Sequence, residues 1–412
     1  MLTASKKRKE PDKRAMKNPL RLLQDHGQSV WLDYLRRSLI TGGELKRLIE
    51  EDGLRGLTSN PSIFEKALAG SNDYRDMLEA PESQGIDAKA LYERIAVRDI
   101  QDAADLLRPV YLGSKRRDGY VSLEVSPQLA RETQGTLGEA RRLWRTVARE
   151  NLMIKVPGTP EGIPAVQQLI SEGINVNVTL LFAQEPYEQV AAAYHGGLES
   201  LARRNADLSK VASVASFFIS PIDTAVDNWI AKRLGASHNP GEQARLRSLL
   251  GKVAIASAKS TYQKYLGILR GDRWQGLSRH GAQTQRLLWA STGTKNPNYS
   301  GVLYVEELIG PDTVNTMPPA TLDAFRDHGR VRLTLTENIE EAMSIMDLVE
   351  QVGIPFKDLT DKLLVDGVKQ FADAFAKLLK ATDRSGKSSD HDPVEFLRVE
   401  LLKDLYQEQH HS

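Results

Sequence analysis

The stretch at residues 151–182 limits the folds open to this chain more than any other part of it. It reads NLMIKVPGTPEGIPAVQQLISEGINVNVTLLF. Apolar segments at 152–156 and 175–181 flank apolar residues at helical spacing, and Gly173 ends the helical pattern. A strand, a short helix and a strand in this order predict two neighbouring parallel strands, because parallel pairing needs such a crossover.

Lys155 stands inside the first of these apolar segments. A lysine is rarely buried without a partner. Burial disfavours the charged form of an amine, and a neutral amine is a nucleophile that can form a Schiff base with a ketone or an aldehyde. The alternative is a structural lysine whose ammonium group reaches solvent at the rim of a sheet. The segment alone does not separate the two interpretations.

The composition narrows the class of protein. The 412 residues are 41% hydrophobic, enough for one large α/β barrel or two to three average domains. The net charge of +1 does not point to nucleic acid or to an anionic membrane. The chain has no cysteine, which excludes disulfides and thiolate chemistry and fits the cytoplasm, the location we expect. No apolar run is long enough for a membrane span, and no secretory signal is visible.

The two ends of the chain differ from its centre. Residues 1–18 carry a net charge of +5, which we interpret as a solvated basic tail rather than a nucleic-acid-binding patch. The barrel is expected to cover residues 19–381, followed at 382–412 by a polar linker and an amphipathic helix that begins near Asp392. That helix is expected to dock on the barrel or on another copy of the chain, as in a homodimer.

Eight apolar segments alternate with helical patterns. Strands are expected at residues 29–33, 54–59, 120–125, 152–156, 175–181, 211–220, 286–291 and 313–317. This alternation predicts an α/β fold, a (β/α)8 TIM barrel with extra helices. Longer helical segments are expected at 223–234 and 240–270, and closing helices at 339–352 and 356–379.

Polar residues gather where these strands end. In such a barrel the active site forms at the carboxyl ends of the strands. The residues there are Asp33, Asn60, Glu124, Lys155, Asn177, Thr179, Ser220 and, after the seventh strand, Lys295. They supply one amine nucleophile, two carboxyl groups that can move protons, and several small hydrogen-bonding groups. Cleavage of a carbon–carbon bond through a Schiff base requires this set.

Each of these residues also has a structural interpretation. Asp33, Asn60 and Ser220 could cap helices or turns. Asn177 and Thr179 could fill the barrel interior. Glu124 could serve only as the ion-pair partner of a buried lysine.

Seven motifs, in order, resemble those of the transaldolase family. They are GLTSNPS at 56–62, LEVSP at 123–127, MIKVPGT at 153–159, INVNVTLLF at 174–182, SFFISP at 216–221, WASTGTKNP at 289–297 and NTMPPATLDAF at 315–325. TSNPS and IKVPGT are specific, and the likeness covers roughly residues 25–380.

The resemblance implies a reaction of the pentose phosphate pathway. A dihydroxyacetone unit would pass from fructose 6-phosphate or sedoheptulose 7-phosphate to glyceraldehyde 3-phosphate or erythrose 4-phosphate. Lys155 would form the Schiff base, and Asp33 would act as acid and base at the leaving hydroxyl. Glu124 and Thr179 would hold a water used in proton transfer. No metal and no organic cofactor is implied, and none of the eight histidines shows ligand-like spacing.

The same resemblance implies which residues bind the sugar phosphates. Asn60, Asn177 and Ser220 would bind the ketose, and Lys295 stands where a phosphate-binding cation is expected. Transaldolases generally place an arginine shortly after the serine of the sixth strand, whereas PIDTA follows Ser220 here. Residues 221–225 therefore do not supply the arginine of that pattern.

Three other functions compete with this interpretation. The nearest is a fructose-6-phosphate aldolase-like enzyme on the same scaffold, which would release the three-carbon unit. A nucleotide-binding protein is disfavoured, because the GKS at 386–388 is preceded by Ala381 where a phosphate-binding loop needs glycine. A catalytically inactive scaffold is disfavoured by the complete set of polar strand ends.

Overall fold

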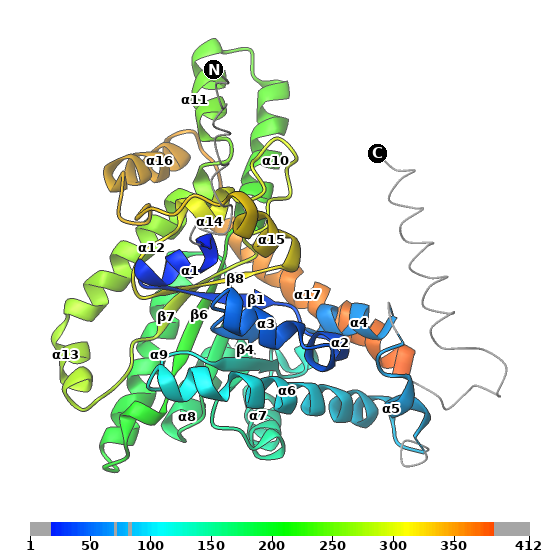
Figure 1. The fold of residues 1–412 in the computed structure, drawn as a ribbon. Helices are drawn as coiled ribbons and strands as arrows, with labels where there is room; N and C mark the ends of the chain where they lie inside the picture. Colours follow the sequence, from blue (N-terminus) through cyan, green and yellow to red (C-terminus); the bar gives the residue numbers. More distant parts are fainter. Residues whose placement is uncertain (1–17, 70–71, 81–84, 383–412) are drawn as a thin grey trace, which may run out of the picture.

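The computed structural model describes residues 18–69, 72–80 and 85–382. Eight parallel strands close into a barrel in sequence order (Figure 1). They are β1 (Gln28–Asp33), β2 (Gly56–Thr58), β3 (Tyr120–Glu124), β4 (Leu152–Pro157), β5 (Val176–Leu181), β6 (Ser213–Phe218), β7 (Arg286–Ala290) and β8 (Thr313–Met317). The prediction of a (β/α)8 barrel is confirmed, and β4 and β5 are parallel neighbours as expected.

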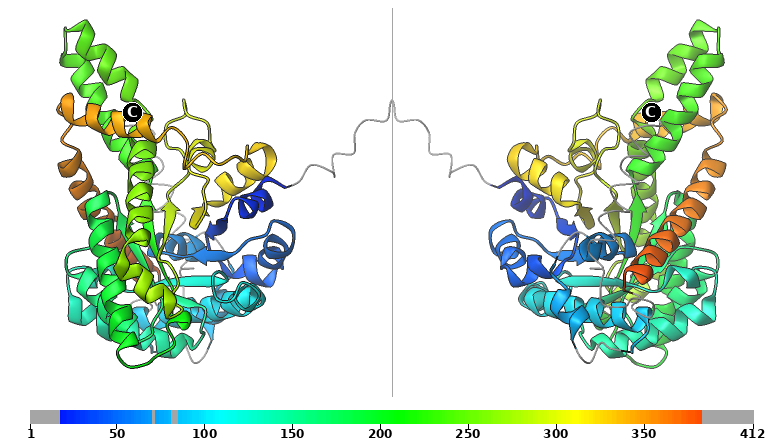
Figure 2. Two further views of the ribbon diagram at one scale, coloured as in Figure 1. Left: turned by 90° about the vertical axis from the view of Figure 1, so that its left-hand side faces the viewer. Right: turned by 90° about the vertical axis from the view of Figure 1, so that its right-hand side faces the viewer.

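Helices surround the barrel. They are α1 (Pro19–Asp25), α2 (Arg37–Thr41), α3 (Glu44–Glu51), α4 (Pro61–Ala69), α5 (Arg75–Glu79), α6 (Ala88–Gly113), α7 (Thr133–Val147), α8 (Gly162–Ser171), α9 (Gln184–Ala202), α10 (Ser220–Ala236), α11 (Pro240–Leu249), α12 (Val253–Arg270), α13 (Asp272–Arg279), α14 (Leu303–Glu307), α15 (Pro319–His328), α16 (Ile339–Gln351) and α17 (Phe356–Thr382). The α10–α11 region projects beyond the rest of the molecule (Figure 2). None of these helices has the length and hydropathy to cross a bilayer.

The predicted element bounds differ from the structure in a few places. The expected sixth strand reaches Ser220, whereas β6 ends at Phe218 and Ser220 begins α10. Residues 37–51 form two helices rather than one, because Gly43 adopts a φ of +79° between α2 and α3. Helices α13 and α15 were not predicted. The proposed basic tail at 1–18, apart from Asn18, lies outside the described residues, and so does the C-terminal helix near Asp392.

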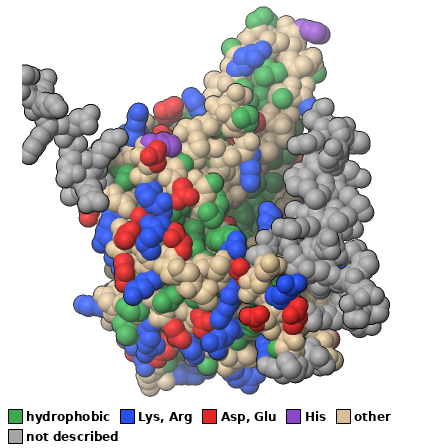
Figure 3. Space-filling model, turned by 45° about the vertical axis from the view of Figure 1, so that its right-hand side comes forward, with side chains coloured by type: hydrophobic (Ala, Val, Ile, Leu, Met, Phe, Trp, Pro, Cys, Tyr) green, Lys and Arg blue, Asp and Glu red, His purple; other side chains and the backbone are tan. Residues whose placement is uncertain are grey.

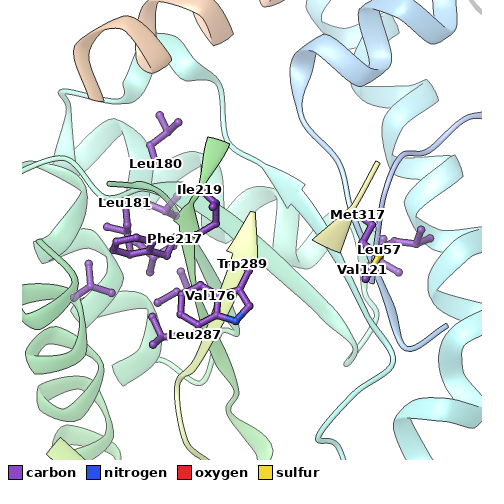
Figure 4. Close-up of a cluster of buried hydrophobic side chains, with 14 of the residues drawn as sticks. Leu57, Val121, Val176, Leu180, Leu181, Phe217, Ile219, Leu287, Trp289 and Met317 are labelled. Atoms are coloured by element: carbon purple, nitrogen blue, oxygen red, sulfur yellow. The ribbon is translucent and has the colours of Figure 1, made fainter. Parts of the chain in front are cut away.

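Both faces of the strands are buried, and their outward faces are apolar. Their outward side chains join the large core between the barrel and the helices, and Figure 4 shows Val176, Phe217, Leu287 and Trp289 in it. The inward side chains near the amino ends form a separate cluster that includes Trp31. A Cβ at Gly56 would lie 2.5 Å from the Trp31 ring, so the glycine leaves the space that the ring fills.

A buried polar network closes the amino end of the barrel, here called the floor. Arg286 and Asp118 form an ion pair with 2.9 Å between Nη2 and Oδ1, and both side chains are at most 10% exposed. Arg286 also donates to Ser29 Oγ at 2.8 Å and to the Arg117 carbonyl at 2.6 Å. Ser29 Oγ in turn donates to Asp118 Oδ2 at 2.9 Å. Both charges of the pair are therefore hydrogen-bonded as well as paired.

The last described helix, α17, runs past the opposite end of the barrel, here called the mouth. It packs against α4, α6 and α10 and reaches β5. These elements come from distant parts of the sequence, so α17 ties them together across the mouth. On the face shown in Figure 3, basic and acidic side chains are interspersed rather than gathered by sign.

Candidate active site

A cavity of about 770 Å³ opens at the mouth of the barrel. Strand ends form its base, and α17 forms part of its wall. Among the residues that line it are Asp33, Thr58, Asn60, Lys155, Thr179, Ser216, Ser291, Lys295 and Thr316. Five of the eight site residues predicted from sequence therefore lie on one cavity.

Lys155 lies on β4 between two polar neighbours. The strand register places it beside Glu124 of β3 and Asn177 of β5. Lys155 is only 4% exposed, and its Nζ donates a hydrogen bond to the carbonyl of Ser59 at 3.2 Å. Nζ lies 3.4 Å from Glu124 Oε2 and 5.6 Å from the centroid of the Phe371 ring. The lysine is buried and paired, and it lines the cavity rather than reaching bulk solvent.

Glu124 is the partner of that amine. Burial raises the pKa of Glu124 to about 7, although the positive charge of Lys155 opposes the shift. Within the described part of the chain, neither carboxylate oxygen has a hydrogen-bond partner. Glu124 is not on the wall of the large cavity and borders a separate cavity of about 20 Å³. The carboxyl group can therefore change protonation near neutral pH while it stays beside the amine.

Asp33 lies at the carboxyl end of β1 and does line the large cavity. Thr58 donates a hydrogen bond of 2.6 Å to Asp33 Oδ1, and its hydroxyl is 2.8 Å from that of Thr316. Burial raises the pKa of Asp33, whereas the charge of Lys155 and the hydrogen bond from Thr58 act in the opposite direction. The carboxyl group is thus oriented by hydroxyls and open to a ligand.

The two predicted residues of β5 have different surroundings. Asn177 is fully buried, donates to Ser122 Oγ at 3.0 Å and accepts from Ser216 Oγ at 2.7 Å. It lies behind the cavity wall, to which Ser216 belongs. Thr179 is also fully buried but lines the cavity, and its hydroxyl has no hydrogen-bond partner among the described residues.

Of the remaining predicted residues, Asn60 and Lys295 line the cavity and Ser220 does not. Asn60 lines the cavity and also caps α4, because its Oδ1 accepts from the amide of Ile63 at 3.0 Å. Ser220 is buried behind the wall, with its hydroxyl 3.1 Å from that of Ser291. Lys295 lines the cavity with an exposed side chain. The structure therefore does not bring Ser220 into contact with the cavity.

Sequence reasoning missed the contribution of α17. The cavity is lined by its residues Leu363, Asp366, Gly367, Gln370 and Phe371. Their spacing of three and four places them on one face of the helix. In the sequence this pattern is that of any amphipathic closing helix, and only the glycine in its middle hints at a close approach.

Comparison with known proteins places the whole barrel in one family. A family model described as transaldolase/fructose-6-phosphate aldolase matches residues 30–382. A protein of Trichodesmium erythraeum named transaldolase is 48% identical over 372 residues, which are 90% of this chain and 98% of that protein. A protein of Nostoc sp. named transaldolase 2 is 47% identical, covering 89% and 97% of the two chains. One of Thiobacillus denitrificans, also named transaldolase, is 48% identical, covering 86% and 96%.

Proposed function

The chain belongs to the transaldolase/fructose-6-phosphate aldolase family, and we propose that it acts as a transaldolase through a Schiff base on Lys155. It would move a dihydroxyacetone unit from fructose 6-phosphate or sedoheptulose 7-phosphate to glyceraldehyde 3-phosphate or erythrose 4-phosphate. The observation that carries the proposal is a buried amine that lines a large cavity, 3.4 Å from a carboxyl group.

The first step forms the imine. The neutral amine of Lys155 attacks the C2 carbonyl of the ketose, and the resulting carbinolamine loses water to give an iminium ion. Protons must be delivered to and taken from the oxygen that leaves. Glu124, with a pKa of about 7 and two oxygens free of hydrogen bonds among the described residues, is suited to this transfer. A water between Glu124 and Thr179 would carry the proton.

The second step cleaves the bond between C3 and C4. Its electron pair moves toward the iminium nitrogen and leaves an enamine on Lys155, while the C4 hydroxyl loses its proton and the aldose departs. We assign that proton to Asp33, whose carboxyl lines the cavity and is oriented by Thr58. The acceptor aldehyde then adds by the reverse of these steps.

The binding residues fall into two groups. Asn60 is placed to contact the ketose directly, because it lines the cavity. Asn177 and Ser220 would act through the hydroxyls of Ser216 and Ser291, which they hold and which do line it. Lys295 at the rim would bind the phosphate, helped by the backbone of the turn that follows β7.

The rival function is a fructose-6-phosphate aldolase that releases free dihydroxyacetone. The family description covers both activities, whereas the relatives compared above are named transaldolase. Rates of transfer to erythrose 4-phosphate and of dihydroxyacetone release without an acceptor separate them. We expect transfer to dominate, and equal rates would favour the aldolase.

Borohydride trapping tests the Schiff base. The protein is reduced in the presence of fructose 6-phosphate and its peptides are analysed by mass spectrometry. Lys259 is an internal control, because it is also 4% exposed and burial lowers its pKa, yet it lines a different cavity, between α12 and α16. We expect a three-carbon adduct on Lys155 and none on Lys259. An adduct elsewhere, or none, would refute the proposal.

A further inference from the structure

We propose that Phe371 determines how the bound three-carbon unit is partitioned between transfer and release. Its ring would cover the imine nitrogen and keep water from the enamine. The three-carbon unit would then stay bound to Lys155 until an acceptor aldehyde binds. The inference rests on the proposed Schiff-base function and adds a specificity-determining residue from α17, a helix that contributes none of the proposed proton-transfer groups.

The first observation is the position of the ring. The centroid of Phe371 is 5.6 Å from Lys155 Nζ, within the range of a cation–π contact. Both residues line the same cavity, and the phenylalanine is partly buried. An iminium ion at this nitrogen would carry its positive charge beside the aromatic ring.

The second observation is the chemical character of the ring within the cavity wall. On the same face of α17, Asp366 and Gln370 also line the cavity and bring polar groups. Phe371 brings an apolar surface without an ionisable proton. It can therefore shield the reacting carbon from water and cannot itself protonate it.

The third observation is how α17 is held near the mouth. The register of β5 shifts between Val178 and Leu181, and Leu180 takes a left-handed φ of +62°. Figure 4 shows the Leu180 side chain apart from the other labelled residues. A Cβ added to Gly367 would lie 2.9 Å from Leu180 Cδ2, so the glycine allows this close approach.

A second contact holds the helix one turn beyond Phe371. The ring of Phe375 packs edge-on against Tyr92 of α6, with 5.6 Å between the centroids. Phe375 is 2% exposed and does not line the large cavity. The backbone of α17 is thus anchored on both sides of Phe371, at Gly367 and at Phe375, and a leucine at position 375 would keep an apolar side chain against Tyr92.

Release and transfer compete for the same enamine. Release begins when C3 takes a proton from water or from a protonated acid, which regenerates the iminium ion. Water then adds to C2, the bond from C2 to nitrogen breaks, and free dihydroxyacetone and the amine of Lys155 result. In transfer, C3 instead attacks the acceptor aldehyde, whose oxygen takes the proton. Water beside the enamine favours the first path.

Substitutions of Phe371, matched by one of Phe375, test the proposal. The transfer-to-release ratio is measured for wild type, Phe371→Leu, Phe371→Ala and Phe375→Leu, with fructose 6-phosphate as donor and erythrose 4-phosphate as acceptor. We expect the ratio to fall about 2- to 30-fold in Phe371→Leu, the range of a cation–π contact, and at least as far in Phe371→Ala. It should stay unchanged in Phe375→Leu.

The ratio does not depend on how much of the protein is folded, so partial unfolding cannot imitate the result. A ratio within twofold of wild type in both Phe371 variants would overturn the inference, and so would an equal fall in Phe375→Leu. Borohydride trapping on the same samples separates the two proposals. If Lys155 is labelled and the ratio does not move, only the role of Phe371 is refuted. If wild-type Lys155 is not labelled, the Schiff-base function fails and this inference falls with it.

Discussion

Two buried ion pairs lie at opposite ends of the same barrel and differ in how they are satisfied. At the floor, Arg286 and Asp118 are 2.9 Å apart and share further hydrogen bonds with Ser29 and a backbone carbonyl. At the mouth, Lys155 and Glu124 are 3.4 Å apart, and the carboxylate has no hydrogen bond among the described residues.

The pKa values of the two carboxyl groups shift in opposite directions. Burial acts to raise the pKa of Asp118. The charge of Arg286 and the hydrogen bonds that Arg286 and Ser29 donate outweigh burial, so the pKa lies below its ordinary value. For Glu124 burial dominates, and the pKa rises to about 7. An ion pair whose carboxylate accepts further hydrogen bonds keeps that group ionised. A buried carboxyl group without such bonds can gain or lose a proton near neutral pH, and groups with pKa values shifted in this way are common at catalytic sites.

The largest effect is expected from removing the amine at the mouth. Lys155→Met should lower transaldolase activity by about 10⁴-fold or more, since the covalent route is lost. The fold should remain, because the replacement is apolar and similar in length. Lys259→Met, which removes the other lysine that is deeply buried in the described part of the chain, should retain activity. Steady-state rates and circular dichroism check both, and an active Lys155→Met variant would contradict the assignment.

Neutralising the mouth carboxylate should have the next largest effect. Glu124→Gln should lower kcat by about 10²–10⁴-fold, as for other general acid–base groups. Glu139 is a matched control, because it is 7% exposed and accepts from the amide of Ser126 at 2.6 Å without lining the large cavity. Glu139→Gln should keep kcat within about threefold. Equal losses in the two variants would mean that Glu124 is structural.

Neutralising the floor carboxylate should instead change stability. Asp118→Asn removes the partner of a buried arginine and should lower the free energy of unfolding by about 3–5 kcal/mol. The floor does not touch substrate, so kcat per folded molecule should not change. Urea unfolding and active-site titration measure the two quantities. A variant of unchanged stability would show that the floor pair contributes little.

Replacing Lys295 tests whether an exposed cation at the mouth contributes to activity through substrate binding alone. Lys295→Ala should raise KM for fructose 6-phosphate by about 10- to 150-fold, the equivalent of one charge-assisted hydrogen bond. The poorer use of unphosphorylated fructose should hardly change, because that sugar has no phosphate to bind. Equal losses on both sugars would make the lysine structural.

The smallest expected effect is on the pH dependence of stability. The pKa of Glu124 is about 7 in the folded protein, above its ordinary 4.5. Its contribution to the free energy of unfolding is therefore fully present below pH 4.5 and is lost as the pH rises through 7. The loss is on the order of 1–3 kcal/mol. Asp118 behaves oppositely, and its contribution is lost as the pH falls below its ordinary 3.8.

Urea unfolding between pH 3 and 8 checks both signs. Glu124→Gln should lack the decline between pH 4.5 and 7, and Asp118→Asn should lack the decline below pH 4. If both variants keep the wild-type profile, other groups control the pH dependence.

Much of the mouth could be predicted from sequence. Strand ends are local, and the barrel brings any polar residue there to the same side, so the position of Lys155, Asp33 and Glu124 followed from the alternation of strands and helices. Asn177 and Ser220 show the limit of this reasoning. The position of a residue at a strand end predicts where it lies along the barrel axis. It does not predict whether the side chain reaches the cavity or contacts a neighbouring hydroxyl instead.

The floor and α17 could not be predicted in the same way. Asp118 lies in a charged turn, and nothing in its neighbourhood indicates that Arg286 will meet it. The left-handed backbone of Leu180 arises from a register shift within the sheet, and its sequence context is that of an ordinary strand. Such contacts depend on the assembled barrel, not on local pattern.

The floor network also bears on the order in which the chain acquires its structure. Ser29, Asp118 and Arg286 come from near the beginning, the first third and the last third of the sequence, and the bond from Arg286 to Ser29 spans 257 residues. While the chain is synthesised, Asp118 emerges long before its arginine. A half-barrel formed early would bury the Asp118 carboxylate without its counter-charge. We therefore expect the half-barrel to stay hydrated and open until β7 has been synthesised and added to the sheet. The network thus penalises premature closure and makes completion of the ring a cooperative, late event.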